Sequence, residues 1–177
     1  MIELWINPYA IAWYIVAKDI GSHEQMNLLN NIYENEIEFI QPKYKGNQKE
    51  FFAQVRYWVD YLIDKENFDR DFSAVAKDFQ SYGRDFSAEE YSRDFKDIDL
   101  FFMLLRIRIR YESKQGYVRI KLRRLLNYYG YKRRSPRLVS HLKKCLRFYH
   151  IQTYLKNGQA CDIGTVDLDK MIMFRII

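Results

Sequence analysis

Residues 130–149 read GYKRRSPRLVSHLKKCLRFY, and this stretch contains the strongest helix start in the chain. Ser135 is a typical N-cap, and Pro136 is a typical first helical residue because its missing N–H has no partner in the first turn anyway. Apolar residues then recur every three or four positions, which predicts one buried face. The stretch therefore predicts a helix that begins at Pro136 and packs on a core. Its apolar side consists of Leu138, Leu142, Cys145, Leu146 and Tyr149.

The opposite side of this predicted helix is polar and basic. Long cationic side chains reach phosphates or guanine edges in the major groove of DNA, and small polar side chains let a helix approach closely. The pattern favours a helix that reads nucleic acid, with an ordinary basic surface as the alternative. The residues on this side are Arg137, Ser140, His141, Lys144 and Arg147.

A basic turn precedes this helix. Residues 122–129 carry an apolar face of an earlier helix, which Gly130 is expected to end. The turn contains Lys132, Arg133 and Arg134, which we expect to neutralise backbone phosphates with an affinity that falls as salt rises. Two helices joined by so short a turn predict a helix-turn-helix unit.

A long helix and a short strand are predicted before this unit. Ser87 with Glu90 forms a capping box, and the periodic apolar residues behind it predict one helix from about Ala88 to Ser113. Residues 117–120 are rich in β-branched side chains and predict a strand.

A strand pair is predicted after the unit. Residues 151–156 alternate in polarity and lead into Asn157-Gly158, the commonest two-residue hairpin turn. Residues 171–177 are a further β-prone run that we expect to pair beside this strand. Residues 158–169 are then left as a loop or wing tip.

The order long helix, short strand, helix, turn, capped helix and β-hairpin resembles the winged helix-turn-helix superfamily. The resemblance covers roughly Asp97 to Ile176. It implies that Lys156 and Asn157 lie on the wing, where they touch the DNA backbone or minor groove. It also implies that the helix after Ser135 lies in the major groove, with bases or phosphates contacted by Arg137, Ser140, His141 and Lys144.

The charge of the wing departs from that superfamily pattern. It contains Asp162, Asp167 and Asp169 and few cations, which suits phosphate poorly. We therefore expect the wing to pack or to bind protein. Winged helices also serve as protein-interaction modules, so the fold alone does not establish DNA binding.

The N-terminal part is predicted to be helical. Asn7 and Pro8 begin a helix that runs to about Lys18 and ends by Gly21, and Ser22 with Gln25 forms a capping box for a second helix. A third periodic segment covers residues 51–62. An Asp-Phe repeat over residues 71–86 predicts a further helix with buried phenylalanines and exposed aspartates.

Acidic and basic residues are unevenly distributed along the chain. Residues 1–102 contain 11 Lys and Arg against 19 Asp and Glu, a net −8, whereas residues 103–177 contain 18 against 4, a net +14. This asymmetry predicts a polyanionic partner; the alternative is that the two parts neutralise each other across an internal contact. We expect an acidic helical region, 1–86, for a protein partner or homodimer contact. A basic winged-helix-like domain, 87–177, follows, which makes the fold mainly α with a small antiparallel β-sheet.

Signals for an enzyme or a metal site are weak. The histidines, His23, His141 and His150, have no Ser, Cys or carboxylate at a motif spacing, and the sequence contains no Gly-rich phosphate loop or HExxH motif. Cys145 and Cys161 lack metal-ligand spacing and are expected to be reduced and structural. We expect no catalytic residue, metal or cofactor. The sequence has no apolar run of about 18 residues and no signal-peptide pattern, so we also expect a cytoplasmic protein without a membrane partner.

The leading prediction is a nucleic-acid-binding protein, specifically a sequence-specific DNA-binding transcriptional regulator whose partner is duplex DNA. RNA is a second reading, through the same cations and stacking tyrosines such as Tyr128 and Tyr131. The alternative is a small inhibitor or adaptor of mobile-element type that binds another protein through its basic or acidic face. The predicted nucleic-acid-binding residues are Lys132, Arg133, Arg134, Arg137, Ser140, His141, Lys144, Arg147, Lys156 and Asn157.

Overall fold

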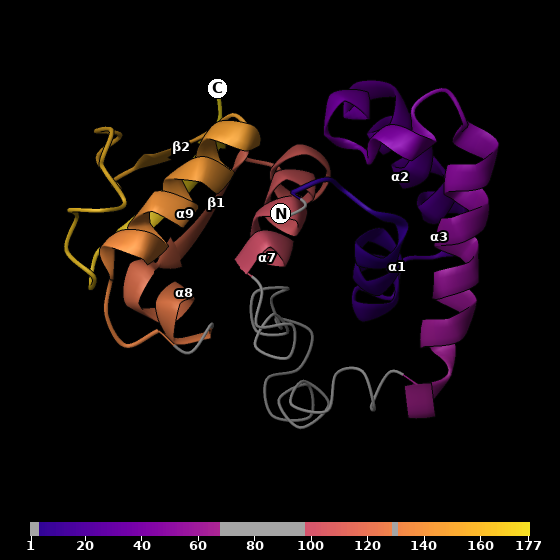
Figure 1. Cartoon of the computed structure of the whole chain (residues 1–177), viewed down its shortest axis with the longest axis horizontal. Coiled ribbons are helices and arrows are strands. Elements are labelled where there is room, and N and C mark those ends of the chain that lie inside the picture. The colour runs from indigo at the N-terminus through magenta and orange to yellow at the C-terminus, as the bar shows by residue number, and fades with distance from the viewer. Residues whose placement is uncertain (1–3, 68–97, 129–130) are drawn as a thin grey trace. The chain divides into compact units, whose positions relative to one another are not determined.

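The computed structural model describes residues 4–67, 98–128 and 131–177 (Figure 1). The chain forms two compact units, Met1–Asp94 and Phe95–Ile177. Its fold is mainly α-helical, with a three-stranded antiparallel sheet in the second unit, as predicted. None of the helices within the described ranges is long and apolar enough to cross a membrane.

Three helices form the described part of the first unit: α1 (Pro8–Ala17), α2 (Ser22–Asn35) and α3 (Gln48–Ile63). The predicted cap of α1 is confirmed, because the Asn7 side chain accepts a hydrogen bond from the Ala10 N–H at 2.9 Å. Helix α1 is buried over most of its surface and packs on α3, where the Tyr9 ring meets the Trp58 ring edge-on at 5.0 Å. Two short 3-10 turns, η1 (Ile37–Phe39) and η2 (Pro42–Tyr44), join α2 to α3.

The start of α2 differs from the prediction. Gly21 is the N-cap and Ser22 is already the first helical residue, so no capping box forms. The Gln25 side chain instead donates a hydrogen bond to the Ile20 carbonyl at 2.6 Å. Gly21 also does not end α1, because the chain turns earlier, at Asp19, whose φ is 51°. An aspartate tolerates this left-handed conformation better than most residues do.

The described part of the second unit contains the helices α7, α8 and α9, of which α8 is the shortest, and three strands. The predicted long helix is present as α7 (Ile98–Ile107) and continues as a π-helical turn, η4 (Arg108–Glu112). A hydrogen bond of 2.8 Å from the Ser113 N–H to the Arg108 carbonyl closes this turn. The part of that helix before residue 98, its capping box and the Asp-Phe repeat lie outside the described residues. The elements are α7 (Ile98–Ile107), η4 (Arg108–Glu112), β1 (Tyr117–Lys121), α8 (Leu122–Tyr128), α9 (Pro136–Phe148), β2 (Ile151–Tyr154) and β3 (Met171–Ile176).

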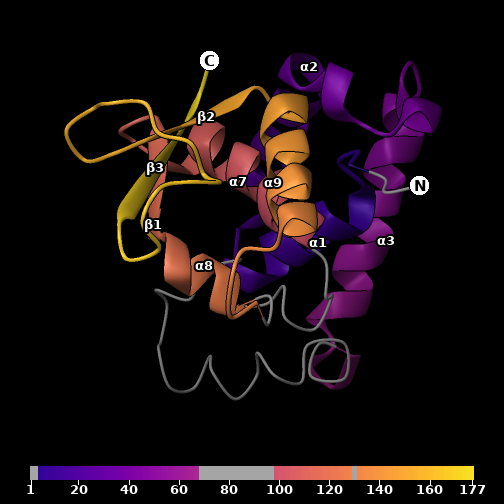
Figure 2. The ribbon, with the colours of Figure 1, turned by 60° about the vertical axis from the view of Figure 1, so that its left-hand side comes forward.

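The strands form one sheet in the order β1-β3-β2, so the last strand in sequence is the central one. The pairing of β1 with β3 places Tyr117 opposite Arg175, and the pairing of β2 with β3 places Thr153 opposite Phe174. The inner face packs on α9 through β2, and Figure 2 shows α9 and α7 near the strands. The Phe174 ring lies 5.9 Å from Phe101 and 6.4 Å from Phe102, so three phenylalanines join the sheet to α7.

A buried arginine joins α7 to the end of α9. The Arg106 side chain is only 5% exposed, and its Nη1 donates a hydrogen bond to the Tyr149 carbonyl at 2.5 Å. Tyr149 is the C-cap of α9, where helix carbonyls lack helical donors and the helix dipole favours a cation. Burying the charge is costly unless it is hydrogen-bonded, so this contact fixes where α9 ends relative to α7.

Replacing Arg106 by methionine should lower the free energy of unfolding by about 1 to 3 kcal/mol, because the Tyr149 carbonyl loses this buried donor. Arg133→Met is the matched control: its side chain is exposed, and the change should shift the same quantity by less than about 0.5 kcal/mol. Urea denaturation followed by circular dichroism measures both. Equal stability of the two variants would contradict a structural role for Arg106.

Candidate nucleic-acid interface

Helix α9 exposes the polar face that the sequence predicts. The Ser135 hydroxyl caps the helix by accepting a hydrogen bond from the Leu138 N–H at 3.2 Å, and Pro136 is the first helical residue. The whole predicted apolar side is buried: Leu138, Leu142, Cys145, Leu146 and Tyr149. Because this side is held in the core, the helix cannot rotate without exposing it. Four predicted residues therefore remain exposed: Arg137, Ser140, Lys144 and Arg147.

Three cations on this face have no acidic partner in the part of the chain that the structure describes. Within the described part of the chain, Arg137, Lys144 and Arg147 take part in no ion pair, whereas Lys143 on the same helix does. Unpaired cations keep their full charge for an anionic partner and pay no cost of breaking an internal ion pair.

His141 lies at the edge of the exposed face and is half-buried. Its Nε2 is 3.5 Å from the Sγ of Cys145, one turn further along α9. The imidazole is thus partly turned toward its own helix, in contrast to the three exposed cations of α9.

The three cations of the basic turn before α9 differ in exposure and in contacts. Lys132 and Arg133 are exposed, as a phosphate contact requires. Arg134 is half-buried, and its Nη1 donates hydrogen bonds to the carbonyls of Ile163 and Val166 in the loop before β3. Arg134 therefore braces that loop, a contact that the sequence did not indicate because the partners are about thirty residues away.

A turn forms at Asn157-Gly158, where it is predicted, but it is not the two-residue hairpin turn expected, because Asn157 lacks the positive φ that this turn requires. Gly158 has a φ of 83° and its N–H donates to the Leu155 carbonyl at 2.9 Å, while the Asn157 Oδ1 accepts from the Gln159 N–H. The strand pairing across the turn is shorter than expected, because it consists of one bridge between Tyr154 and Ala160. Strand β2 pairs along its length with β3 instead. Two predicted residues, Lys156 and Asn157, are exposed at the turn.

The loop of residues 162–169, here called the acidic loop, packs against one flank of α9. A Cβ at Gly164 would lie 2.8 Å from the Val139 Cγ1, so glycine is required for this close approach. The Lys143 ammonium donates a hydrogen bond to Asp162 at 2.7 Å. This bond, with a second one from the Gly164 N–H, holds the pKa of the Asp162 carboxyl below its usual value.

The other end of the acidic loop pairs with two further cations. Asp169 accepts two hydrogen bonds from Arg123, at 2.9 and 2.8 Å, and lies 3.1 Å from Lys121. The hydrogen bond from Arg123 is the main reason that the pKa of Asp169 is strongly lowered. The loop thus neutralises Lys143, Arg123 and Lys121, a pairing that the sequence did not indicate.

No protein-family model, curated protein or solved structure matches this chain. The candidate interface is therefore defined by the structure of the chain itself. It consists of the exposed face of α9 and the exposed part of the preceding turn, and the acidic loop lies along one flank.

Proposed function

We propose that this chain binds duplex DNA through the exposed face of α9 and acts as a DNA-binding transcriptional regulator. The observation that carries the proposal is a set of three cations, Arg137, Lys144 and Arg147, that form no ion pair with any residue the structure describes and lie opposite a fully buried apolar side. An α-helix with its side chains is about 10 to 12 Å across and fits a major groove about 12 Å wide. Arg137 and Lys144 are seven residues apart, so they are separated by about 10 Å along the helix and can reach different phosphates.

The order of elements supports this proposal. Helix α7, strand β1, helices α8 and α9, and strands β2 and β3 follow each other as the resemblance to winged helix-turn-helix proteins leads one to expect. In this proposal α9 enters the major groove and the exposed Lys132 and Arg133 contact the adjoining backbone. Lys156 and Asn157 contact the backbone from the wing, while the rest of the wing stays on the protein.

A second part of the proposal concerns the N-terminal unit, which we infer to form a homodimer contact or to bind a protein partner. Helix α3 presents two large apolar side chains to solvent, Tyr57 at 60% exposure and Ile63 at 66%. A dimer would place two copies of α9 on one duplex and favour a palindromic site.

Arg137→Ala with Lys144→Ala should weaken duplex binding for all sequences, because two phosphate contacts are removed while the buried side of α9 is untouched. The slope of log K against log salt should flatten by about one for each lost contact. Fluorescence anisotropy at several salt concentrations measures both. The control is Lys114→Ala with Lys170→Ala, which removes the same charge from exposed positions outside α9 and should change affinity far less. A folded α9 variant with unchanged affinity and slope would favour the protein-inhibitor alternative.

Asp162→Asn should strengthen duplex binding, because Lys143 loses its partner and becomes available to phosphate. The salt slope should steepen by about one. Asp167→Asn is the matched control. It changes the net charge equally, and an amide oxygen can still accept the hydrogen bond that the Asp169 N–H donates to the Asp167 Oδ1. If the two variants gain the same affinity, the gain comes from net charge alone and the acidic loop does not mask Lys143.

A further inference from the structure

The outer face of the three-stranded sheet carries aromatic and basic side chains. Side chains alternate between the two faces of a strand, so the positions that share a face with Tyr117 and Arg175 point away from the core. Arg119 and Arg175 are exposed on this face, and Tyr117 and Tyr154 are half-buried. The positions on this face are Tyr117, Arg119, Lys121, Gln152, Tyr154, Met171, Met173 and Arg175, and no acidic residue is among them. Met173, on the central strand, is buried, whereas Met171 at the end of that strand is exposed.

Two tyrosines and an arginine form a row across this face. The guanidinium carbon of Arg175, on the central strand, is 5.4 Å from the ring centroid of Tyr117 on β1 and also 5.4 Å from that of Tyr154 on β2. Both distances are within the range of a cation–π interaction. The row thus brings three flat groups together on one surface, and each is of a kind on which nucleic-acid bases stack.

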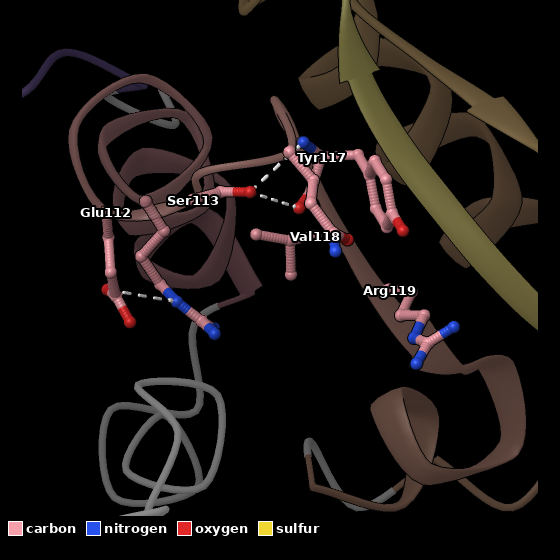
Figure 3. A pocket seen from close by; sticks show the side chains of 7 residues that line it. Glu112, Ser113, Tyr117, Val118 and Arg119 are labelled. Carbon is pink, nitrogen blue, oxygen red and sulfur yellow. Dashed lines mark hydrogen bonds and ion pairs between the residues drawn. The ribbon is translucent and has the colours of Figure 1, made fainter.

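A cavity adjoins the row at the edge of β1. It has a volume of about 260 Å³, and Figure 3 shows the Val118 side chain pointing toward η4 while Tyr117 and Arg119 extend from the other side of β1. The Ser113 hydroxyl donates to the Tyr117 carbonyl at 2.7 Å and accepts from the Tyr117 N–H at 3.2 Å, which fixes the start of the strand. The cavity is lined by Arg108, Glu112, Ser113, Gln115, Tyr117, Val118 and Arg119.

The charges of this surface favour an anion. Glu112 lies 3.6 Å from Arg108, and Lys121 is paired with Asp169, so these charges are balanced within the protein. Arg119 takes part in no ion pair among the described residues, and Arg175 contacts rings rather than carboxylates. A partner that suits this surface therefore combines negative charge with flat rings whose faces are accessible.

We propose that the outer sheet face and its adjoining cavity bind single-stranded nucleic acid, with bases stacked on the Tyr117–Arg175–Tyr154 row and a phosphate beside Arg119. In a duplex the base faces are covered by neighbouring bases, so a row of flat groups selects unpaired nucleotides. This site goes beyond the proposed duplex binding, because it lies on the sheet and uses none of the α9 side chains.

The 177-residue chain should bind a labelled oligothymidine strand about tenfold more tightly than an abasic strand of the same length, since the abasic strand keeps the phosphates and lacks the bases. Tyr154→Leu should remove part of this factor, about threefold, because leucine is apolar but offers no ring, while Tyr117 and Arg175 remain. Tyr154→Phe keeps the ring and should bind as the unchanged protein does. Anisotropy measures all of these affinities, and the duplex affinity of each variant should stay the same.

Arg119→Gln gives a second measurement on an exposed side chain, in case Tyr154→Leu fails to fold. It should flatten the salt slope for the single strand by about 0.7, the value for one phosphate contact. Equal affinity for the thymidine and abasic strands would overturn the proposal, and so would equal binding by the leucine and phenylalanine variants. The variant lacking Arg137 and Lys144 should keep its single-strand affinity, so failure of the duplex proposal and failure of this one give different results.

Discussion

The hydrogen bond from the buried Arg106 guanidinium to the Tyr149 carbonyl is the contact on which the second unit depends. A buried charge is tolerated only where its donors are satisfied, and here the partner is the end of α9. His150 follows at once with a φ of 52°, and the chain passes directly into β2. The same contact therefore fixes the end of the candidate recognition helix and the start of a strand, and through both it sets which face of α9 meets solvent.

Electrostatics then decides how much of the basic surface is available. The second unit is strongly basic in sequence, but the acidic loop pairs with Lys143, Arg123 and Lys121. Each of these exposed ion pairs contributes little to stability. Their larger effect is on the surface potential, because they concentrate unpaired charge on one side of α9 and on the outer face of the sheet. Net charge alone would have suggested a more uniform basic surface.

Local signals predicted most of the described fold. The Ser135 cap, with the apolar periodicity behind it, depends on neighbours within a few residues, and it was predicted correctly. Ser22 looked equally convincing, yet Gly21 takes the cap position because the Gln25 side chain bonds to the Ile20 carbonyl instead. Contacts across long separations were missed for a different reason. Nothing near Lys143 or Arg134 in sequence indicates a loop some twenty to thirty residues away, so the bracing of the acidic loop needed coordinates.

The strand order β1-β3-β2 also has a consequence for how the protein is made. Tyr117 pairs with Arg175, so β1 cannot pair until a strand nearly sixty residues later in the sequence has been synthesised. Strand β2 pairs with the same strand. Until β3 emerges from the ribosome, both flanking strands have unpaired edges and the phenylalanine cluster around Phe174 is incomplete. A sheet built on such distant pairing folds late and slowly, and an interrupted chain that lacks β3 would expose apolar strands that tend to aggregate.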